Sequence, residues 1–173
     1  MRSVGKAAKP ARDYAAVDYT IRPLTSEDEN ILWEMLYHAV AAKPGDTPSR
    51  DVVQQPELAR YVAGWGRDGD RGFVAHDAES GKPFAAAWLR LPVGEHKGFG
   101  YVDEATPELA FAVHPQHRNR GIATSLLTQL VRSTPDEAAI SLSKAAGNPA
   151  LRLYERFGFR VVHRSGDVIK MQR

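Results

Sequence analysis

The chain of 173 residues contains no cysteine. This excludes disulfide bonds, thiolate nucleophiles and cysteine-ligated metals, and it fits a reducing compartment, so we expect a cytoplasmic protein. Long apolar runs are also missing. The longest, FAAAWL at 84–89, is far too short to cross a membrane. A net charge of only +2 argues against a general nucleic-acid binder, so we expect neither a membrane nor nucleic acid as partner.

Several ligand-binding signatures are absent or misplaced. The chain has no G-x-x-x-x-G-K-[ST] sequence, which excludes a P-loop. GWGRDG at 64–69 fits G-x-G-x-x-G, but a predicted helix precedes it where a dinucleotide motif needs a strand, so we expect a solvated loop. HPQH at 114–117 offers two histidines without a third ligand nearby, so we expect no metal.

The pattern of apolar residues predicts one α/β (α+β) domain over 18–173, after a flexible tail over 1–17 that lacks the apolar region of a secretory signal. Ser26 and Glu29 have the spacing of a capping box, which predicts a helix that runs to about Val40. Further helices are expected at 56–64, 120–132 and 148–157, and a loop at 42–51. Strands are expected at 18–24, 71–78, 82–92, 107–115, 138–145, 159–165 and 167–172. Strand–helix–strand order in the second half predicts parallel pairing there.

The densest positive charge lies in HPQHRNRGIATSLLTQLV at 114–131, where a helix begins. Ile122, Leu126 and Leu130 recur at helical spacing, so this helix packs against a sheet. Its first turn presents unpaired N–H groups and the positive end of the helix dipole. Gly121 leaves room for close approach to the backbone, and Arg118 and Arg120 add charge. This combination is typical of a phosphate cradle, although a turn with Gly and Arg also occurs for solubility alone.

The same stretch resembles a motif of the GNAT superfamily of N-acetyltransferases, V-x-P-x-x-[RQ]-x-x-G-x-[GA]. The matching residues are Val113, Pro115, Arg118, Gly121 and Ala123. A second stretch, NPALRLYERFGF at 148–159, resembles the other hallmark of the superfamily, N-x-x-A-x-x-[LF]-Y-x-x-x-G-F, with Ala150 one place closer to Asn148 than in the pattern. The resemblance covers roughly 18–173. It implies a mixed central sheet of six to seven strands, flanked by about four helices and splayed between the fourth and fifth strands.

The resemblance also implies a co-substrate, acetyl-CoA, and no metal. The expected cofactor-binding residues are Phe111, Ala112, Val113, Arg118, Asn119, Arg120, Gly121, Ile122, Ala123, Thr124, Asn148 and Tyr154. Tyr154 is expected to protonate the leaving thiolate, unless it is simply a core aromatic. Lys144 stands where relatives usually have valine, and it is either neutral to function or in contact with the cofactor arm.

A base is needed because an amine with a pKa near 10.4 is charged at neutral pH, and removing its proton costs about 4–5 kcal/mol at pH 7. Glu108 is the candidate, because its strand leads into the phosphate loop; the alternative is a carboxylate that only bonds locally, and Glu104 and Asp103 are reserves.

The acceptor is expected to be an amine on a small molecule or a peptide. Candidate contact residues are Trp33, Tyr37, Arg90 and Glu104, with His38, Trp65 and Trp88 as further aromatics that are more typical of a core. Aromatics with carboxylates suit a small cationic amine, whereas Arg90 would select an acceptor that bears a carboxylate. The resemblance allows a homodimer. Two rival interpretations are a non-catalytic CoA-binding module and an enzyme that binds nucleotides in the same cradle.

Overall fold

The computed structural model describes residues 18–41, 47–94, 97–135 and 138–173. The predicted tail at 1–17 and half of the predicted loop at 42–51 lie outside these residues. The elements are β1 (Tyr19–Pro23), α1 (Glu29–Val40), η1 (Arg50–Gln54), α2 (Pro56–Ala59), β2 (Arg71–Asp77), β3 (Pro83–Arg90), β4 (Glu108–Val113), η2 (Pro115–His117), α3 (Ile122–Ser133), β5 (Ser141–Ala145), α4 (Leu151–Arg156), β6 (Arg160–Ser165) and β7 (Val168–Gln172). The predicted α/β class is confirmed.

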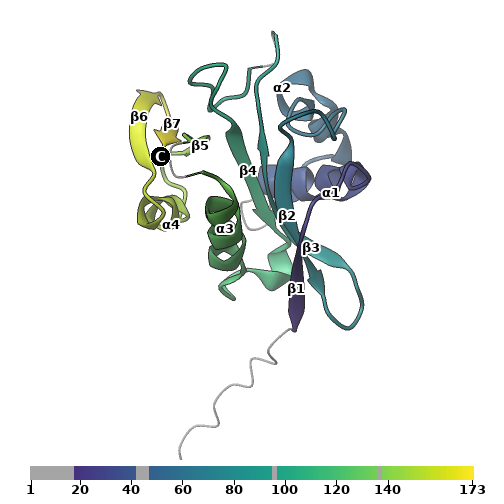
Figure 1. The fold of residues 1–173 in the computed structure, drawn as a ribbon. Coiled ribbons are helices and arrows are strands. Elements are labelled where there is room, and N and C mark those ends of the chain that lie inside the picture. Colours follow the sequence, from purple (N-terminus) through teal and green to yellow (C-terminus); the bar gives the residue numbers. More distant parts are fainter. Residues whose placement is uncertain (1–17, 42–46, 95–96, 136–137) are drawn as a thin grey trace, which may run out of the picture.

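The seven strands form one mixed sheet in the order β1-β2-β3-β4-β5-β7-β6. All neighbours are antiparallel except β4 and β5, which are parallel and share a single register pair, Glu108 with Ser141. Beyond that pair the two strands diverge, and Figure 1 shows β5 to β7 with α4 standing apart from β1 to β4. The predicted splay between the fourth and fifth strands is therefore confirmed.

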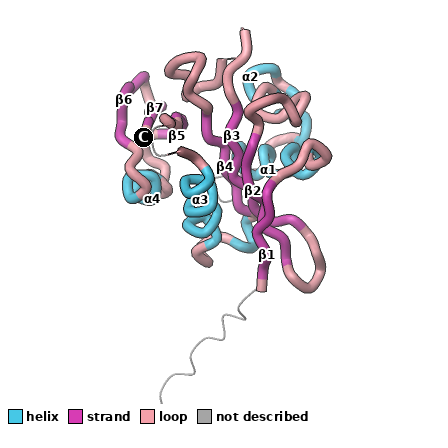
Figure 2. Tube along the Cα trace, in the orientation of Figure 1, coloured by secondary structure: helices cyan, strands magenta, loops and turns pink. Residues whose placement is uncertain are grey.

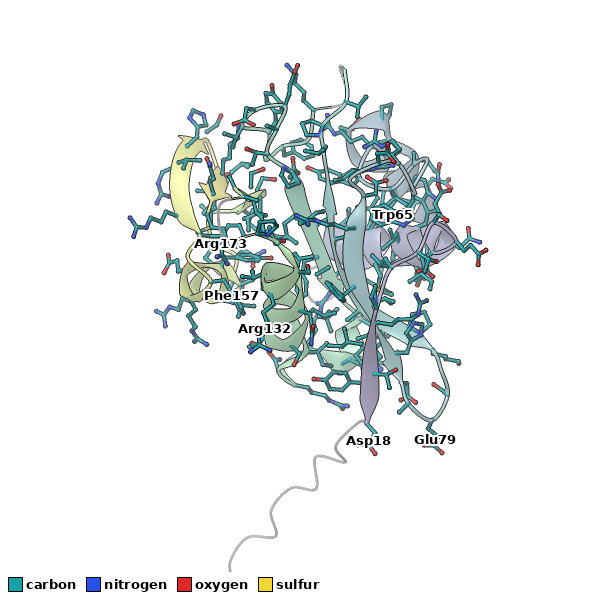
Figure 3. All side chains as sticks on the ribbon, in the orientation of Figure 1. Asp18, Trp65, Glu79, Arg132, Phe157 and Arg173 are labelled. Carbon is teal, nitrogen blue, oxygen red and sulfur yellow. The ribbon has the colours of Figure 1, made fainter. Side chains whose placement is uncertain are left out.

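Helices cover both faces of the sheet, as the tube view in Figure 2 shows. On one face, Leu32 and Met35 of α1 join Trp88 of β3 in one buried cluster. On the other face, Leu126 and Leu130 of α3 belong to a second cluster that reaches Tyr154 of α4. In Figure 3 Trp65 lies on the side of α1 and α2, and Phe157 lies with α4 on the other side.

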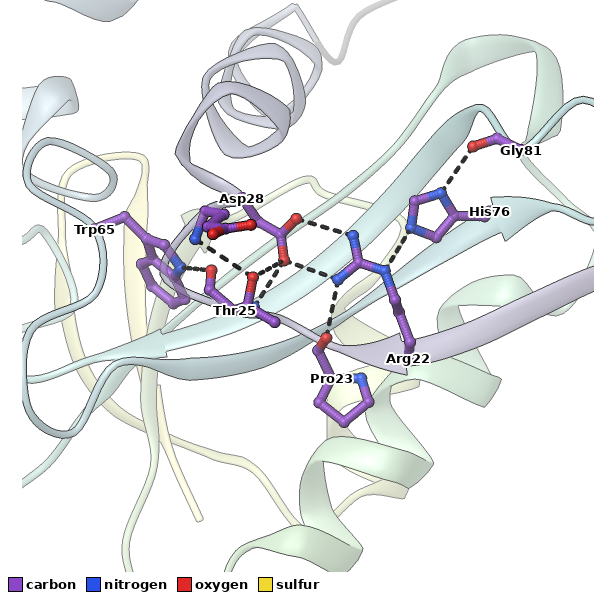
Figure 4. A network of polar contacts seen from close by, with 8 residues as sticks. Arg22, Pro23, Thr25, Asp28, Trp65, His76 and Gly81 are labelled. Atoms are coloured by element: carbon purple, nitrogen blue, oxygen red, sulfur yellow. Dashed lines mark hydrogen bonds and ion pairs between the residues drawn. The ribbon is translucent and has the colours of Figure 1, made fainter.

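The beginning of α1 differs from the predicted capping box. Asp28, not Ser26, is the N-cap residue, and its side chain does not cap the helix. Its carboxylate instead accepts two hydrogen bonds of 2.8 Å from Arg22 and one of 2.7 Å from the N–H of Thr25 (Figure 4). This network ties β1 to α1. Glu29 is also engaged elsewhere, because its Oε1 accepts from the N–H of Trp65 at 2.9 Å.

The helix before the closing hairpin begins later than predicted. The sequence predicts a helix over 148–157, but α4 begins at Leu151. The Asn148 Oδ1 accepts from the N–H of Ala150 at 2.8 Å and holds a turn that precedes the helix. The predicted end is right: Gly158 has φ +90°, a conformation that glycine adopts without strain, and Phe159 is buried against Tyr154. The predicted helix at 56–64 is shortened to α2.

Candidate functional site

The splay leaves one edge of β4 without a neighbouring strand. The N–H of His114 donates to the carbonyl of Phe84 at 2.7 Å, on the β3 side. Because backbone groups alternate along a strand, the N–H groups of Phe111 and Val113 point the other way, toward β5. Among the described residues, that side has no register partner beyond Glu108. An extended amide-containing chain can therefore bond to β4 there as an added strand would.

The splay leads to the start of α3. Asn119 and Gly121 both have positive φ values, +63° and +75°, and turn the chain into the helix. The amide groups of Ile122, Ala123 and Thr124 form its first turn, where α-helices lack internal acceptors. A Cβ on Gly121 would meet no heavy atom within 4 Å, so the space in front of these amides is open. Arg120 is exposed beside them. The geometry suits an anion such as a diphosphate.

Arg118 has a more structural position than the sequence suggested. Its Nε donates to the carbonyl of Val113 at 3.2 Å. Its Nη2 lies 3.5 Å from the carbonyl of His38, in the last turn of α1. The side chain is half-buried. Arg118 thus connects the loop to β4 and α1, and it adds positive charge from behind the amides.

Tyr154 and Lys144 lie on the far side of the splay. Tyr154 is only 1% exposed, and burial raises the pKa of its phenol, which therefore stays protonated at neutral pH. Lys144 stands on β5 opposite Ile169, three residues beyond the only β4–β5 pair. Burial lowers the pKa of its ammonium, while the charge of Glu108 acts in the opposite direction.

Glu108 lies at the closed end of the splay and is 7% exposed. Its Oε1 accepts from the N–H of Gly100 at 3.0 Å. Burial raises the pKa of this carboxyl, and the rise is limited by the neighbouring Tyr61 hydroxyl, the Gly100 amide and the charges of Arg60 and Lys170. A carboxyl with a raised pKa is a stronger base once it is ionised.

Three arginines line a cavity together with Glu108. Its polar wall is formed by Arg60, Tyr61, Arg67, Arg90, Tyr101, Thr106 and Glu108. Arg90 comes from β3, whereas Arg60 and Arg67 come from the segment between α2 and β2. Sequence reasoning missed Arg60, Arg67, Tyr61 and Tyr101. The charged GWGRDGDR segment was the available signal, because it holds one of the missed arginines.

That segment is a loop, as predicted, but it is not simply solvated. Trp65 is buried, and its Nε1 donates to the carbonyl of Thr25 at 3.0 Å. The side chain of Asp70 is 2% exposed and accepts from the Nε of Arg90 at 3.2 Å. Its other oxygen accepts from the N–H groups of Gly66 and Arg67. The loop therefore fixes both Asp70 and Arg90.

The other predicted acceptor residues do not line this cavity. Trp33 packs on the α1 side and its indole lies 3.4 Å from the Glu29 carboxylate, while the Tyr37 hydroxyl donates to the carbonyl of Pro48 at 2.8 Å. Glu104 and Asp103 are exposed in the loop before β4. Of the four residues first named for the acceptor, only Arg90 stands next to Glu108. Trp88, Trp65 and His38 are buried, and the core assignment of Trp88 is right.

Three histidines from α1 and η2 lie close together, next to the loop that precedes α3. The rings of His38 and His114 have centroids 4.7 Å apart, and those of His114 and His117 are 5.9 Å apart. The Nε2 of His38 lies 3.2 Å from the carboxylate of Glu34. Burial and the nearby His114 lower the pKa of His38, so its ring is neutral at pH 7. Over the described ranges, no group of three or more histidine or acidic side chains is arranged to hold a metal.

None of the helices in the described ranges is long and apolar enough to span a membrane. In comparisons with known proteins, the model of the acetyltransferase (GNAT) family matches residues 32–159. No curated protein sequence matches the chain.

Three solved structures share the fold. YncA, a putative acetyltransferase from Salmonella typhimurium with acetyl-CoA, is 23% identical (TM-score 0.58) and covers 90% of this chain and 93% of its own. The PaiA N-acetyltransferase from Thermoplasma acidophilum with coenzyme A is 17% identical (TM-score 0.60), and the match covers 90% of this chain and 98% of that chain. The spermidine N-acetyltransferase from Vibrio cholerae with CoA and spermine is 20% identical (TM-score 0.55), and the match covers 90% of this chain and 94% of that chain.

Proposed function

This chain belongs to the acetyltransferase (GNAT) family, and on that premise we propose that it is an N-acetyltransferase that moves an acetyl group from acetyl-CoA to a primary amine. The observation that carries the proposal is the continuous path along β4. It runs from the open amides at the start of α3, past the free N–H groups of Phe111 and Val113, to the buried carboxylate of Glu108. Structures of the same fold hold acetyl-CoA or CoA.

The cofactor would bind along this path. Its diphosphate would accept hydrogen bonds from the amides of Gly121, Ile122, Ala123 and Thr124, with Asn119 and Arg120 at the rim and Arg118 behind them. The pantetheine amides would bond to β4 over residues 111–113, which include Ala112, and Asn148, in the turn before α4, would also bond the pantetheine arm. A backbone N–H near Val113 would polarise the thioester carbonyl.

The reaction would be a direct attack. Glu108 takes the proton of the ammonium, either directly or through a water molecule, and the neutral nitrogen attacks the thioester carbon. A C–N bond forms and the C–S bond breaks. The departing thiolate takes its proton from the Tyr154 phenol, whose raised pKa keeps it protonated until then. The nitrogen loses its second proton as the amide forms, and this proton restores the phenol through water. Tyr154 is buried, so its role requires that the sulfur fill the splay beside it.

A panel of amines tests the proposal. Purified protein is mixed with acetyl-CoA and, in turn, simple alkylamines, polyamines, amino acids and lysine peptides, and released thiol is measured with a colorimetric thiol reagent. The absence of cysteine removes any background from the protein itself. We expect thiol release with at least one amine and an acetylated product by mass spectrometry. Protection from heat by acetyl-CoA without release for any amine would indicate a CoA-binding module instead.

A further inference from the structure

Arg90 and Glu108 stand directly opposite each other on β3 and β4. Cross-strand partners have Cβ atoms about 4.5–5.5 Å apart on the same face of the sheet. These two side chains nevertheless form no ion pair with each other in the described part of the chain; Arg90 pairs with Asp70 instead. Both line the same cavity. A cationic group and a carboxylate from neighbouring strands thus line one cavity without pairing with each other.

Arg90 has unused hydrogen-bonding capacity in this cavity. The residue is 5% exposed, its Nε donates to Asp70, and its Nη1 donates to the carbonyl of Arg60 at 3.0 Å. Its Nη2 is buried and has no hydrogen-bond partner among the described residues. A buried unpaired N–H of a guanidinium is costly, so a site of this kind is complete only when an acceptor arrives.

The charge around the cavity also favours an anion. Arg60, Arg67 and Arg90 line it, whereas the acidic groups on it or beside it are Glu108 and Asp70. Asp70 is already occupied by Arg90 and two backbone amides. The Nη2 of Arg67 donates to the carbonyl of Leu91 at 3.2 Å. Because the Arg67 side chain is about one-third exposed, it can also turn toward a ligand.

We infer that the acceptor carries a carboxylate next to its amine, as an α-amino acid does. The inference rests on the proposed function. The carboxylate would bind the Nη2 of Arg90, with Arg67 and Arg60 around it, and the ammonium would face Glu108. In the transfer step Glu108 takes the ammonium proton, and the nitrogen is acetylated as the thiolate leaves. The carboxylate of the acceptor remains bound and unchanged.

The test compares matched acceptors. A set of L-α-amino acids is assayed beside the carboxamide of each and beside the corresponding amine without the carboxyl group, and kcat/KM is measured by thiol release. We expect kcat/KM for the best free acid to exceed that of its carboxamide by tenfold or more. The carboxamide has the less basic and thus more available amine, so a preference for the acid runs against intrinsic reactivity. Equal kcat/KM for the acid and its carboxamide would overturn the inference. If no amine in the panel gave thiol release, the proposed function itself would be overturned.

Arginine variants locate the carboxylate. Arg67→Gln leaves the Arg90–Asp70 pair intact, and Arg90→Gln removes the unpaired donor. Each should raise KM for the acid by about tenfold to a hundredfold and leave KM for the carboxamide nearly unchanged. Arg132→Gln, on the exposed end of α3, is the matched control. Circular dichroism establishes which variants fold; if Arg90→Gln does not fold, Arg67→Gln decides. An unchanged ratio of acid to carboxamide in the folded arginine variants would contradict the inference.

Discussion

A methyl group on Gly98 would lie 2.1 Å from Oε1 of Glu108, closer than any real contact of a Cβ atom. The loop that holds Gly98 and Gly100 therefore packs directly on the carboxylate. Gly100 also approaches β5, because a Cβ there would lie 2.8 Å from the carbonyl carbon of Leu142. The absence of side chains at these two positions lets the loop cover the Glu108 carboxylate, and this burial raises the pKa of the carboxyl.

Gly98→Ala is expected to displace the Glu108 carboxylate and to lower kcat by about tenfold or more, since small displacements of a catalytic group are costly. Glu108→Gln should lower kcat by about a hundredfold or more, in the usual range for a general base. The control is Gly147→Ala, because a Cβ at Gly147 meets nothing within 4 Å. Steady-state kinetics at saturating acetyl-CoA measures all three. Full activity of Glu108→Gln would transfer the role of the base to another group or to water.

The pH profile of the rate follows from the raised pKa of Glu108. The carboxyl must be ionised to accept a proton, so activity falls as the pH drops through this pKa. Because burial raises the pKa, the acid limb should lie above the ordinary carboxyl range near 4.5. Measuring kcat/KM from pH 5 to 9 locates that limb. In Glu108→Gln the limb should disappear; its persistence at the same pH would assign it to a different group.

Tyr154→Phe is expected to lower kcat by about a hundredfold, the lower end for loss of general acid catalysis, while the Kd for acetyl-CoA stays the same. The substitution removes only the hydroxyl, and the ring remains in place against Phe159. Turnover and cofactor binding by calorimetry are measured separately. Phe159→Leu serves as a packing control, because it disturbs the same cluster and keeps the phenol. Unchanged turnover in Tyr154→Phe would make the residue a core aromatic only.

Arg120→Ala should weaken acetyl-CoA binding by about tenfold at low salt and less at high salt, because this exposed side chain interacts mainly through its charge. Arg118→Ala should weaken binding at every salt concentration, because it also removes the bond to the Val113 carbonyl that fixes the loop. Calorimetric titrations at two ionic strengths separate these effects. Equal affinity in the double variant would remove the anion-binding role from this loop.

The histidines at the loop make stability depend on pH. Burial lowers the pKa of His38 in the folded chain, so the unfolded chain binds the proton more readily. The contribution of neutral His38 to the free energy of unfolding is complete above the pKa of the unfolded chain, near 6.5. This contribution is lost as the pH falls toward the lower pKa of the folded chain. The free energy of unfolding should thus decrease between pH 7 and 5.5. His38→Gln should flatten that slope, whereas His163→Gln, exposed on β6, should leave it unchanged in urea titrations.

The sequence predicted the fold well because its signals were local. Alternating apolar residues indicated the strands, and the helical spacing of Ile122, Leu126 and Leu130 indicated α3. Predictions failed where a distant partner decided the outcome. Asp28 replaced Ser26 at the start of α1 because Arg22 on β1 holds its carboxylate, and Asn148 supports a turn before α4 rather than the helix itself.

The candidate site shows the same division. The residues proposed to bind the diphosphate are contiguous in sequence, from Arg118 to Thr124, so a local motif can indicate them. The arginine cavity joins the segment after α2 to β3 and β4, and the register of Arg90 with Glu108 depends on strand pairing that no local pattern reveals. Arg60 and Arg67 were therefore missed, and the aromatics of α1 were assigned to the acceptor although they pack elsewhere.

The single register pair between β4 and β5 has a consequence for handling the protein. An unpaired strand edge can recruit a strand from another molecule, and this chain has such an edge inside its sheet. A bound pantetheine arm would occupy it. Storage with coenzyme A should accordingly suppress aggregation, and protein freed of the coenzyme should be the form that precipitates first.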